Sequence, residues 1–477
     1  MRSSAAVVVV VGAAGCFIAD VDLRTGSGPR DGGADAGVEP GVVVVDVVVD
    51  PFGAGRFAAV ARVGDELLIG PGPAGDDVLR WIDGAPPERL TLRFLADVVG
   101  HVPVNATSSA SIGRSGCAPG TASCGPDGED GRGLFTGVRV NGADALLLTG
   151  ARQAGDLNYV YAGAVDGSEL VLRYLDVSDV LPSKAHTVSA AHVFQDRVYV
   201  GLPDSGGDGP GLAMIAVLPE SPGADLDESQ PCEATSSTAC DLQGGLLPAL
   251  GGPIPLAMID AIASFGGRLY VGNHAGIARA TVERPAAVGA NPAHWIDVTP
   301  SSSAWLTRAS VITARIADLE PADRAIAGFA STAGRFLLAR NTTDGPQLFT
   351  CAPASIVQAT CESADWTIID DDDDGLTRFG SGASIRISVL LEKDGVVYVG
   401  LDHPAGARLF QTTDGQTFRG HEGCDAVDVG CAGIGGAGFG TGRPLFLSAA
   451  VAADGALFFV LGDGVGPPDV AQIRIPD

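Results

Sequence analysis

The amino-acid sequence predicts an all-β fold, a seven-bladed β-propeller with four-stranded blades, from three observations. A glycine-rich turn followed by a short apolar strand recurs along the chain. Windows that look helical are short, and Gly (67) and Pro (30) punctuate the whole sequence. The two ends of the repeat region carry strands that complement each other. A repeat of this kind cannot bury its apolar face alone, so neighbouring copies must pack together.

The repeat is clearest at residues 265–273 (FGGRLYVGN), where a two-glycine turn precedes a run of alternating apolar residues closed by glycine. The same order of turn and strand stands at 62–70 (RVGDELLIG) and 392–400 (EKDGVVYVG). Branched and aromatic residues bounded by glycine are typical of strands. The first strand residues of the seven copies are Leu67, Leu147, Val198, Leu269, Phe336, Val397 and Leu457.

Each repeat reads as four strands. One strand leads into the glycine turn, and the recurring element is the second. A third follows, such as ARLFQT (407–412), and then a fourth, such as TFRGH (417–421) or the tryptophan-bearing HWIDV (294–298) and DWTII (365–369). Four short antiparallel strands repeated around a ring describe a propeller blade. The spacing within 301–325 predicts a short helix between blades.

The ends of the repeat region predict how the ring closes. The last repeat has a first, a second and a third strand, and the third (VAQIRIP) stands just before Asp477. The valine-rich run Val42–Val49 precedes the first repeat and has no blade of its own. We therefore expect Val42–Val49 to supply the outer strand of the last blade, which removes the open edges of the sheets.

The N-terminus predicts export and anchoring. Residues 1–15 hold one arginine, a short apolar run and then small residues, which is the pattern of a secretory signal peptide too short to span a bilayer. The sequence AAGC at 13–16 resembles a bacterial lipobox, and this resemblance implies that Cys16 is lipidated. The alternative is an ordinary cleaved signal peptide. Residues 16–40, rich in Gly, Asp and Pro, predict a flexible tether, and 41–477 the propeller domain.

Composition and cysteine content agree with an exported protein. By resemblance to the lipoprotein sorting rule, Phe17 after the cysteine implies the outer membrane of a Gram-negative bacterium, on its surface or periplasmic side. The formal charge of −27 argues against binding nucleic acid and limits membrane contact to the lipid. The other eight cysteines form close pairs without metal-site spacing, which predicts disulfides in an exported chain. These pairs are Cys117/Cys124, Cys232/Cys240, Cys351/Cys361 and Cys424/Cys431.

One hairpin carries a family resemblance. The sequence QTTDGQTF (411–418) resembles the Asp-box hairpin of sialidase-like propellers. The resemblance implies that Asp414 caps the turn amides, that Gly415 takes a positive φ and that Phe418 packs beneath the turn. In that family the box is structural, and we expect the same here. Most of 41–477 is similar to multi-bladed propeller lipoproteins of the myxobacterial type.

An acidic run offers a candidate cation site, the one cofactor that the sequence suggests. Asp370, Asp372 and Asp374 alternate before Gly375, as in the opening of a calcium loop, where carboxylates converge on a hard cation. The closing acid of such a loop is replaced by Ser381. The alternative is a solvated acidic loop between blades.

Polar residues that follow the second strands are the candidate ligand-binding residues. VGNHAG (271–276) and VGLDHPAG (399–406) each place a histidine just after such a strand. Loops at one end of a ring are held rigidly and commonly form ligand sites. The alternative is that these are ordinary polar loop residues. The candidates are Asn273, His274, Asp402, His403, Arg152, Arg340 and Asp204.

No catalytic residue is predicted, because no nucleophile–base pair, phosphate loop or H-E-x-x-H motif occurs at motif spacing. The sequence favours an envelope-anchored binding or scaffold module for a protein or glycan, with a monomeric body. The alternatives are a carbohydrate-active enzyme, a glycoside hydrolase or lyase, and a purely structural envelope subunit. Paired carboxylates or a buried histidine at the mouth of the ring would favour the enzyme.

Overall fold

The computed structural model describes the central strands of the repeats and the turns between them. The described residues are 18–22, 44–48, 59–70, 78–82, 85–94, 111–112, 134–140, 142–151, 158–175, 190–195, 197–202, 211–215, 242–246, 259–282, 294–310, 324–353, 359–369, 379–380, 384–420, 425–426, 431, 433–452, 455–462 and 468–475.

Almost all regular structure in these residues is β-strand, and consecutive strands pair antiparallel into short sets. The first two sets in chain order are β3 (Ala59–Val63), β4 (Glu66–Gly70), β5 (Val78–Arg80) and β6 (Glu88–Phe94), and then β8 (Phe135–Val140), β9 (Ala143–Ala151), β10 (Asn158–Asp166) and β11 (Glu169–Leu175), with β7 (Ser111–Ile112) beside β9. The next three sets are β12 (Ala191–Phe194), β13 (Arg197–Leu202), β14 (Gly211–Ile215) and β15 (Leu242–Leu246); β16 (Ala261–Phe265), β17 (Arg268–Asn273), β18 (Gly276–Ala280) and β19 (Trp295–Asp297); and β20 (Ile326–Thr332), β21 (Arg335–Thr342), β22 (Gly345–Cys351) and β23 (Trp366–Ile368). The last two sets are β24 (Arg386–Lys393), β25 (Val396–Asp402) and β26 (Arg408–Thr412), and then β27 (Leu445–Val451), β28 (Leu457–Gly462) and β29 (Asp469–Arg474).

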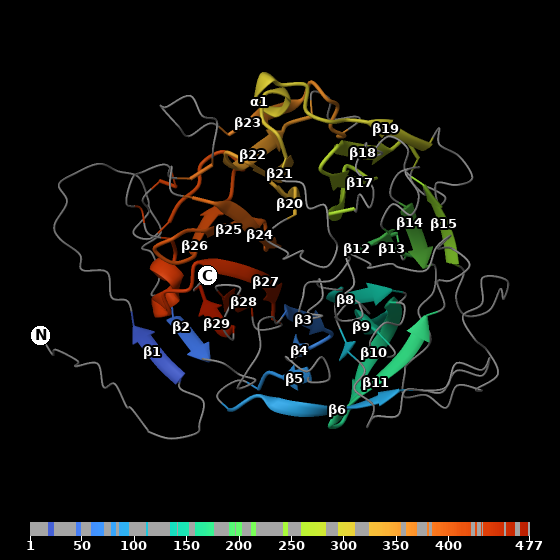
Figure 1. Ribbon diagram of the computed structural model, residues 1–477, viewed down its shortest axis with the longest axis vertical. Helices are drawn as coiled ribbons and strands as arrows, with labels where there is room; N and C mark the ends of the chain where they lie inside the picture. The colour runs from blue at the N-terminus through green and yellow to red at the C-terminus, as the bar shows by residue number, and fades with distance from the viewer. Residues whose placement is uncertain are drawn as a thin grey trace, which may run out of the picture.

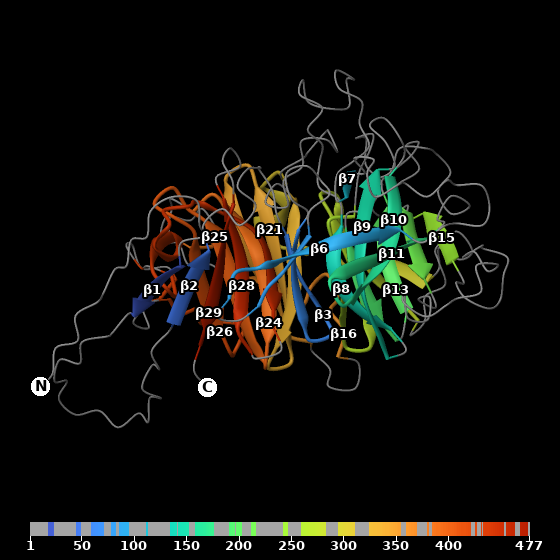
Figure 2. The same cartoon turned by 90° about the horizontal axis from the view of Figure 1, so that it is seen from below.

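The first strands of the sets contact one another in a closed cycle. β3 contacts β8, β8 contacts β12, and the series continues through β16, β20, β24 and β27 back to β3. The sets therefore radiate from a common axis, as Figure 1 shows along that axis and Figure 2 from the side. The protein is a β-propeller. Each set is a blade, named below by its first strand.

The β27 blade is completed from the other end of the chain. β2 (Val44–Val48) pairs antiparallel with β29, with Val44 opposite Arg474 and Val48 opposite Val470. The predicted pairing of the valine-rich run with the last repeat is confirmed over these residues. A further strand, β1 (Ile18–Asp22), pairs with the free edge of β2. β1 lies within the predicted tether, and an open strand edge such as that of β2 offers backbone groups that a second strand can satisfy.

Two neighbouring blades are joined at their outer edges. β6 of the β3 blade pairs parallel with β11 of the β8 blade, so these two blades share one sheet. The N–H of Thr91 donates to the carbonyl of Ser168 (2.9 Å), and Arg93 Nε lies 2.8 Å from Glu169 Oε2. The outer edges of both blades are thereby covered along this pairing.

The recurring second strands form the core. β17, β21, β25 and β28 are buried along almost their whole length. Neighbouring blades pack on both faces of these strands, so neither face is left for polar side chains. This explains why the repeat reads as a nearly continuous apolar run. At one such interface the ring of Phe336 stacks on Phe265 (4.8 Å between centroids) and Phe329 (5.2 Å).

The predicted glycine turns before these strands include two-residue turns with positive φ. Between β24 and β25, Lys393 pairs with Val396, so the turn consists of Asp394 and Gly395 alone. Both residues have positive φ (52° and 79°). A two-residue turn of this kind matches the twist of the strands it joins, and Asp-Gly is a preferred sequence for it.

Two local predictions have different outcomes. The short helix expected within 301–325 is present as α1 (Ser303–Leu306). The fourth strand expected at 417–421 is reduced to a bridge between Gln411 and Arg419, because Arg419 also bridges to Asp425 and the chain folds back. No helix among the described residues is long and apolar enough to cross a membrane.

Candidate functional site

Three of the candidate ligand-binding residues lie where second strands end. Asn273 and Asp402 are the last residues of β17 and β25, and Arg340 lies two residues before the end of β21. The first strands begin at this same end, since Arg386 at the start of β24 pairs with Asp402. This end of the ring, with Asn273, Arg340 and Asp402, is called the polar end below.

Asn273 closes the turn that follows its strand. Its side chain is fully buried, and Oδ1 accepts the N–H of Ala275 (2.8 Å) and of Gly276 (3.3 Å). A side-chain oxygen that bonds the backbone two residues on is the usual way in which Asn stabilises a turn. The neighbouring His274 is half-buried, and burial lowers its pKa, so its imidazole is uncharged at neutral pH.

Arg340 is buried and its guanidinium group is saturated. Nε donates to Ser310 Oγ (3.1 Å), and Nη1 donates to the carbonyl of Trp305 (3.1 Å) and to Gln347 Oε1 (3.0 Å). Nη2 donates to the carbonyl of Arg308 (2.7 Å) and again to Ser310 Oγ (2.9 Å). These bonds use all five donors of the group. Burial lowers the pKa of Arg340 to about 10.

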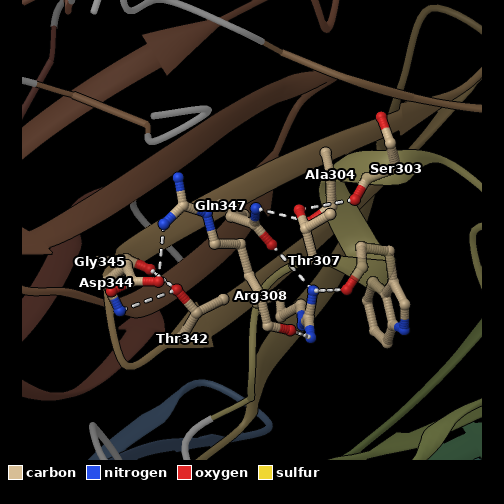
Figure 3. Close-up of polar contacts among 10 residues, drawn as sticks. Ser303, Ala304, Thr307, Arg308, Thr342, Asp344, Gly345 and Gln347 are labelled. Atoms are coloured by element: carbon tan, nitrogen blue, oxygen red, sulfur yellow. Dashed lines mark hydrogen bonds and ion pairs between the residues drawn. The ribbon is translucent and has the colours of Figure 1, made fainter. Parts of the chain in front are cut away.

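The partners of Arg340 show what it holds in place. The guanidinium carbon lies 3.8 Å from the centroid of the Trp305 ring in α1, a cation–π contact. Gln347 Nε2 in turn donates to the carbonyl of Ala304 (3.2 Å), and Arg308 pairs with Asp344 (2.7 Å), contacts drawn in Figure 3. Arg340 therefore fastens α1 to the β20 blade. The described hydrogen bonds of its guanidinium group are all made within the protein, and its predicted role in ligand binding stays a prediction.

Asp402 and His403 are also engaged in the framework. Asp402 is 3% exposed and its Oδ2 lies 2.9 Å from Arg386 Nη2. His403 Nδ1 accepts the backbone N–H of Ala405 (3.1 Å). The backbone N–H of His403 donates to the carbonyl of Pro444, which links this turn to the β27 blade. Burial and the nearby charge of Arg408 lower the pKa of His403, so it too is uncharged at neutral pH.

Two polar residues that the sequence did not single out tie neighbouring blades together at this end. Asp260 Oδ2 accepts the N–H of Ile326 (3.0 Å) in the first strand of the next blade. Asn341 does the same one blade further on: Oδ1 accepts the N–H of Ile387 and Nδ2 donates to its carbonyl, both at 2.9 Å. Asn341 could have been found from the repeat, because it occupies the position in β21 that the candidate Asp402 occupies in β25. Asn341 lies two residues after Ala339, and Asp402 lies two residues after the equivalent Gly400.

The carboxylates described at the polar end are held by arginines or by a backbone N–H group. The described carboxylates Asp402 and Asp469 are paired with Arg386 and Arg443 at 2.9 and 3.3 Å. Asp260 is deeply buried, which raises its pKa to about 6, although the Ile326 N–H and the charge of Arg324 oppose this shift. The described residues hold no group of three or more His, Cys, Asp or Glu that could bind a metal ion.

The buried Asp260 makes stability depend on pH. Its pKa is raised in the folded state, so its stabilising contribution is complete below pH 3.8 and is lost as the pH rises through about 6. The shift from 3.8 to about 6 corresponds to about 3 kcal/mol. Asp260→Asn keeps a neutral acceptor for the Ile326 N–H. We expect the variant to gain up to about 3 kcal/mol relative to the native protein between pH 4 and pH 7.5.

Urea unfolding of both proteins at the two pH values measures this difference. Any change in unfolding free energy that the asparagine causes equally at both pH values cancels when the two differences are subtracted. The same offset at pH 4 and at pH 7.5 would show that folding does not shift the pKa of Asp260.

The Asp-box-like hairpin is structural, as the family resemblance implies. Asp414 Oδ1 accepts the N–H groups of Gln416 and Thr417, both at 2.8 Å, and the hydroxyl of Thr412 (3.0 Å). Burial raises the pKa of Asp414, but these hydrogen bonds outweigh it and the pKa is lowered. Gly415 has a φ of 68°, and the buried ring of Phe418 meets Phe379 edge-on at 4.9 Å. The predicted roles of Asp414 and Gly415 are confirmed, and Phe418 is buried.

Replacing Asp414 tests the strength of this turn. We expect Asp414→Ala to lower the free energy of unfolding by about 1–2 kcal/mol, because two turn amides lose their acceptor. Asp414→Asn, which still offers an oxygen, should cost less than half as much. Thermal and urea unfolding at pH 7 compare the two variants. Equal costs would mean that the turn depends on the charge of the carboxylate and not on its geometry as an acceptor.

Of the predicted disulfides, Cys351–Cys361 is present. Cys431 is also disulfide-bonded. The remaining predicted positions lie outside the described residues: Cys16, Cys117, Cys124, Cys232, Cys240, Cys424, Arg152, Asp204, Asp370, Asp372 and Asp374. The signal peptide at 1–15 lies outside them as well.

Neither a protein-family model nor a curated protein matches the chain. Among solved structures, polysaccharide lyase Uly1 is 9% identical with a TM-score of 0.41, over 89% of this chain and 90% of the lyase. The soluble aldose sugar dehydrogenase of Escherichia coli is 11% identical with a TM-score of 0.35, over 91% and 100%. The PQQ-bound aldose sugar dehydrogenase of Streptomyces coelicolor is 13% identical with a TM-score of 0.34, over 77% and 98%. Similarity at this level identifies no family and no activity.

Proposed function

We propose that this protein is a seven-bladed propeller of the bacterial cell envelope that acts as a binding or scaffold module for a protein or glycan. The cycle of first strands from β3 through β27 supports the blade number. Four-stranded blades are complete at β12, β16 and β20, and β2 supplies the fourth strand of the β27 blade. A closed ring of this kind has no loose end, so it presents its turns as two rigid surfaces.

A single observation carries the choice of binding over carbohydrate chemistry. At the polar end, Asp402 and Asp469 are each paired with an arginine, and Asp260 holds a backbone N–H group of the next blade. Glycoside hydrolysis needs two carboxyl groups on either side of one bond, about 5 to 9.5 Å apart and differently protonated. The described polar end offers a rigid, hydrogen-bonded surface in which Asp402 and Asp469 are each paired with an arginine. This is the property that a binding surface requires, because a preorganised surface loses little entropy when it binds.

Anchoring at the membrane belongs to the same proposal. The lipobox-like sequence before Cys16 supports lipidation there, and Phe17 supports an outer-membrane location. In this proposal the body of the protein is a monomer and touches the bilayer through its lipid. The net charge of −27 supports contact through the lipid alone, because anionic lipid head groups repel such a surface.

One experiment tests binding and anchoring together. The full chain and a Cys16→Ser variant are expressed in a Gram-negative host and fractionated. We expect the native protein in the outer-membrane fraction, labelled by radioactive palmitate, and the variant soluble and unlabelled.

Purified protein is then mixed with peptidoglycan sacculi and with solubilised outer-membrane proteins, and saturable binding to one of them is expected. Release of reducing sugars or unsaturated uronides would instead establish the carbohydrate-active enzyme, and no saturable binding would favour a structural subunit.

A further inference from the structure

The structure brings together a serine and a histidine that lie far apart in the sequence. His192 is the second residue of β12, and Ser264 is the fourth residue of β16. These are the first strands of two neighbouring blades, which contact each other at the ring axis. His192 Nε2 lies 3.0 Å from Ser264 Oγ. Their distance is within the range required of a nucleophile and its base.

The surroundings of the pair keep the histidine uncharged at neutral pH. Ile262, two residues before Ser264 and so on the same face of β16, packs with Ala190 and Phe194 in the apolar interface between the blades. Both members of the pair are only partly buried, so they border solvent at the inner edge of this interface. Burial lowers the pKa of His192 to about 4, which leaves its imidazole uncharged at neutral pH. An uncharged imidazole with its proton on Nδ1 accepts a proton at Nε2.

We propose that Ser264 is a nucleophile for carboxylic esters, with His192 as its general base. Ser264 Oγ forms a bond to the ester carbonyl carbon while its proton passes to His192 Nε2. The alkoxide leaving group departs with that proton as the free alcohol, and the acyl group stays on Ser264. Water then attacks the acyl carbon with His192 again as base, which releases the carboxylic acid and restores the serine. The inference goes beyond binding and does not depend on the proposed ligand or on lipidation.

The ring contains its own control for this pair. Ser331 in β20 stands opposite Phe336, the first apolar residue of its second strand, as Ser264 stands opposite Leu269. Ser331 is also partly buried, but it has no histidine partner among the described residues. The two serines therefore share backbone position and exposure, and differ in the base. Any difference in reactivity between them is attributable to His192.

Labelling with a biotinylated fluorophosphonate tests the proposal on the full-length protein. The probe loses fluoride as Ser264 Oγ bonds to phosphorus, and the labelled serine is identified by peptide mass spectrometry. We expect labelling at Ser264, none at Ser331, and none in Ser264→Ala. His192→Gln should slow labelling about 100-fold, because a positioned general base contributes at least that factor. Glutamine retains a hydrogen-bond acceptor toward Ser264, and circular dichroism verifies that the variant is folded.

The pH dependence supplies a second readout that needs no variant. Labelling of Ser264 should be constant from pH 6 to 8 and decline near pH 4, where His192 becomes protonated. Hydrolysis of p-nitrophenyl acetate should follow the same profile. Absence of labelling at Ser264, equal labelling of Ser331, or an unchanged rate in folded His192→Gln would each overturn the proposal.

Discussion

Gly266→Ala is expected to destabilise the protein by at least about 3 kcal/mol, because overpacking of this kind adds to backbone strain. Gly266 lies in the turn between β16 and β17 with a φ of 55°. A Cβ added there would overlap the carbonyl group of Ala359 in the next blade. Relief of this overlap requires backbone of one blade to move away from the other.

The loop that contains Ala359 is poorly able to retreat. The disulfide Cys351–Cys361 closes it, and the N–H of Cys361 donates to Tyr270 Oη (2.9 Å) in the β16 blade. Arg279 Nη1 donates to the carbonyl of Cys361 (3.3 Å) and also pairs with Glu362 (2.8 Å). The segment that directly follows Ala359 is therefore fastened to the β16 blade, and the disulfide ties that segment to β22.

Gly267→Ala is a matched control at the neighbouring position. Gly267 also has a positive φ (71°), but a Cβ there meets no atom within 4 Å. We expect this variant to cost only about 1 kcal/mol, the strain of a left-handed backbone conformation. Urea unfolding of both variants and the native protein gives the difference. Equal costs for the two alanine variants would show that the loop at Ala359 yields freely and that the blades are not fixed there.

Arg340→Met is the second substitution with a large expected effect, a loss of about 3–5 kcal/mol. Methionine fills a similar volume but donates no hydrogen bond. Four acceptors lose their donor, two of them the carbonyl groups of Trp305 and Arg308. The others are the side-chain oxygens of Ser310 and Gln347. The cation–π contact to Trp305 is lost as well.

The control for this variant is Arg335→Met, at the other end of the same strand, where the arginine is half-buried. We expect it to cost less than about 1 kcal/mol, as is usual for residues away from such networks. Limited proteolysis provides a second readout, with cleavage near α1 in Arg340→Met alone. If the two variants unfold at the same urea concentration and resist protease equally, Arg340 does not hold α1.

Features that depend on local pattern could be predicted from the sequence. The all-β class, the buried second strands and the Asp394-Gly395 turn follow from apolar runs and from residues that accept positive φ. The pairing of Val44–Val48 with β29 follows from counting strands. The last repeat has only three strands of its own, and the valine-rich strand before the first repeat belongs to no other blade. The roles of Asp414 and the link Cys351–Cys361 also lie within short segments. In each case the interacting residues are close in sequence or related by the repeat.

The candidate site depended on contacts that no local pattern encodes. Arg340 and Asp402 are polar residues near the end of apolar strands, and the sequence placed both in a ligand site. Only the packing of α1 and the position of Arg386 show that both face the framework. Asp260 and its partner Ile326, like His192 and Ser264, meet because the ring sets neighbouring blades side by side. A side chain's chemistry is fixed by its burial and its partners, and for Asp260 and His192 those partners come from the neighbouring blade.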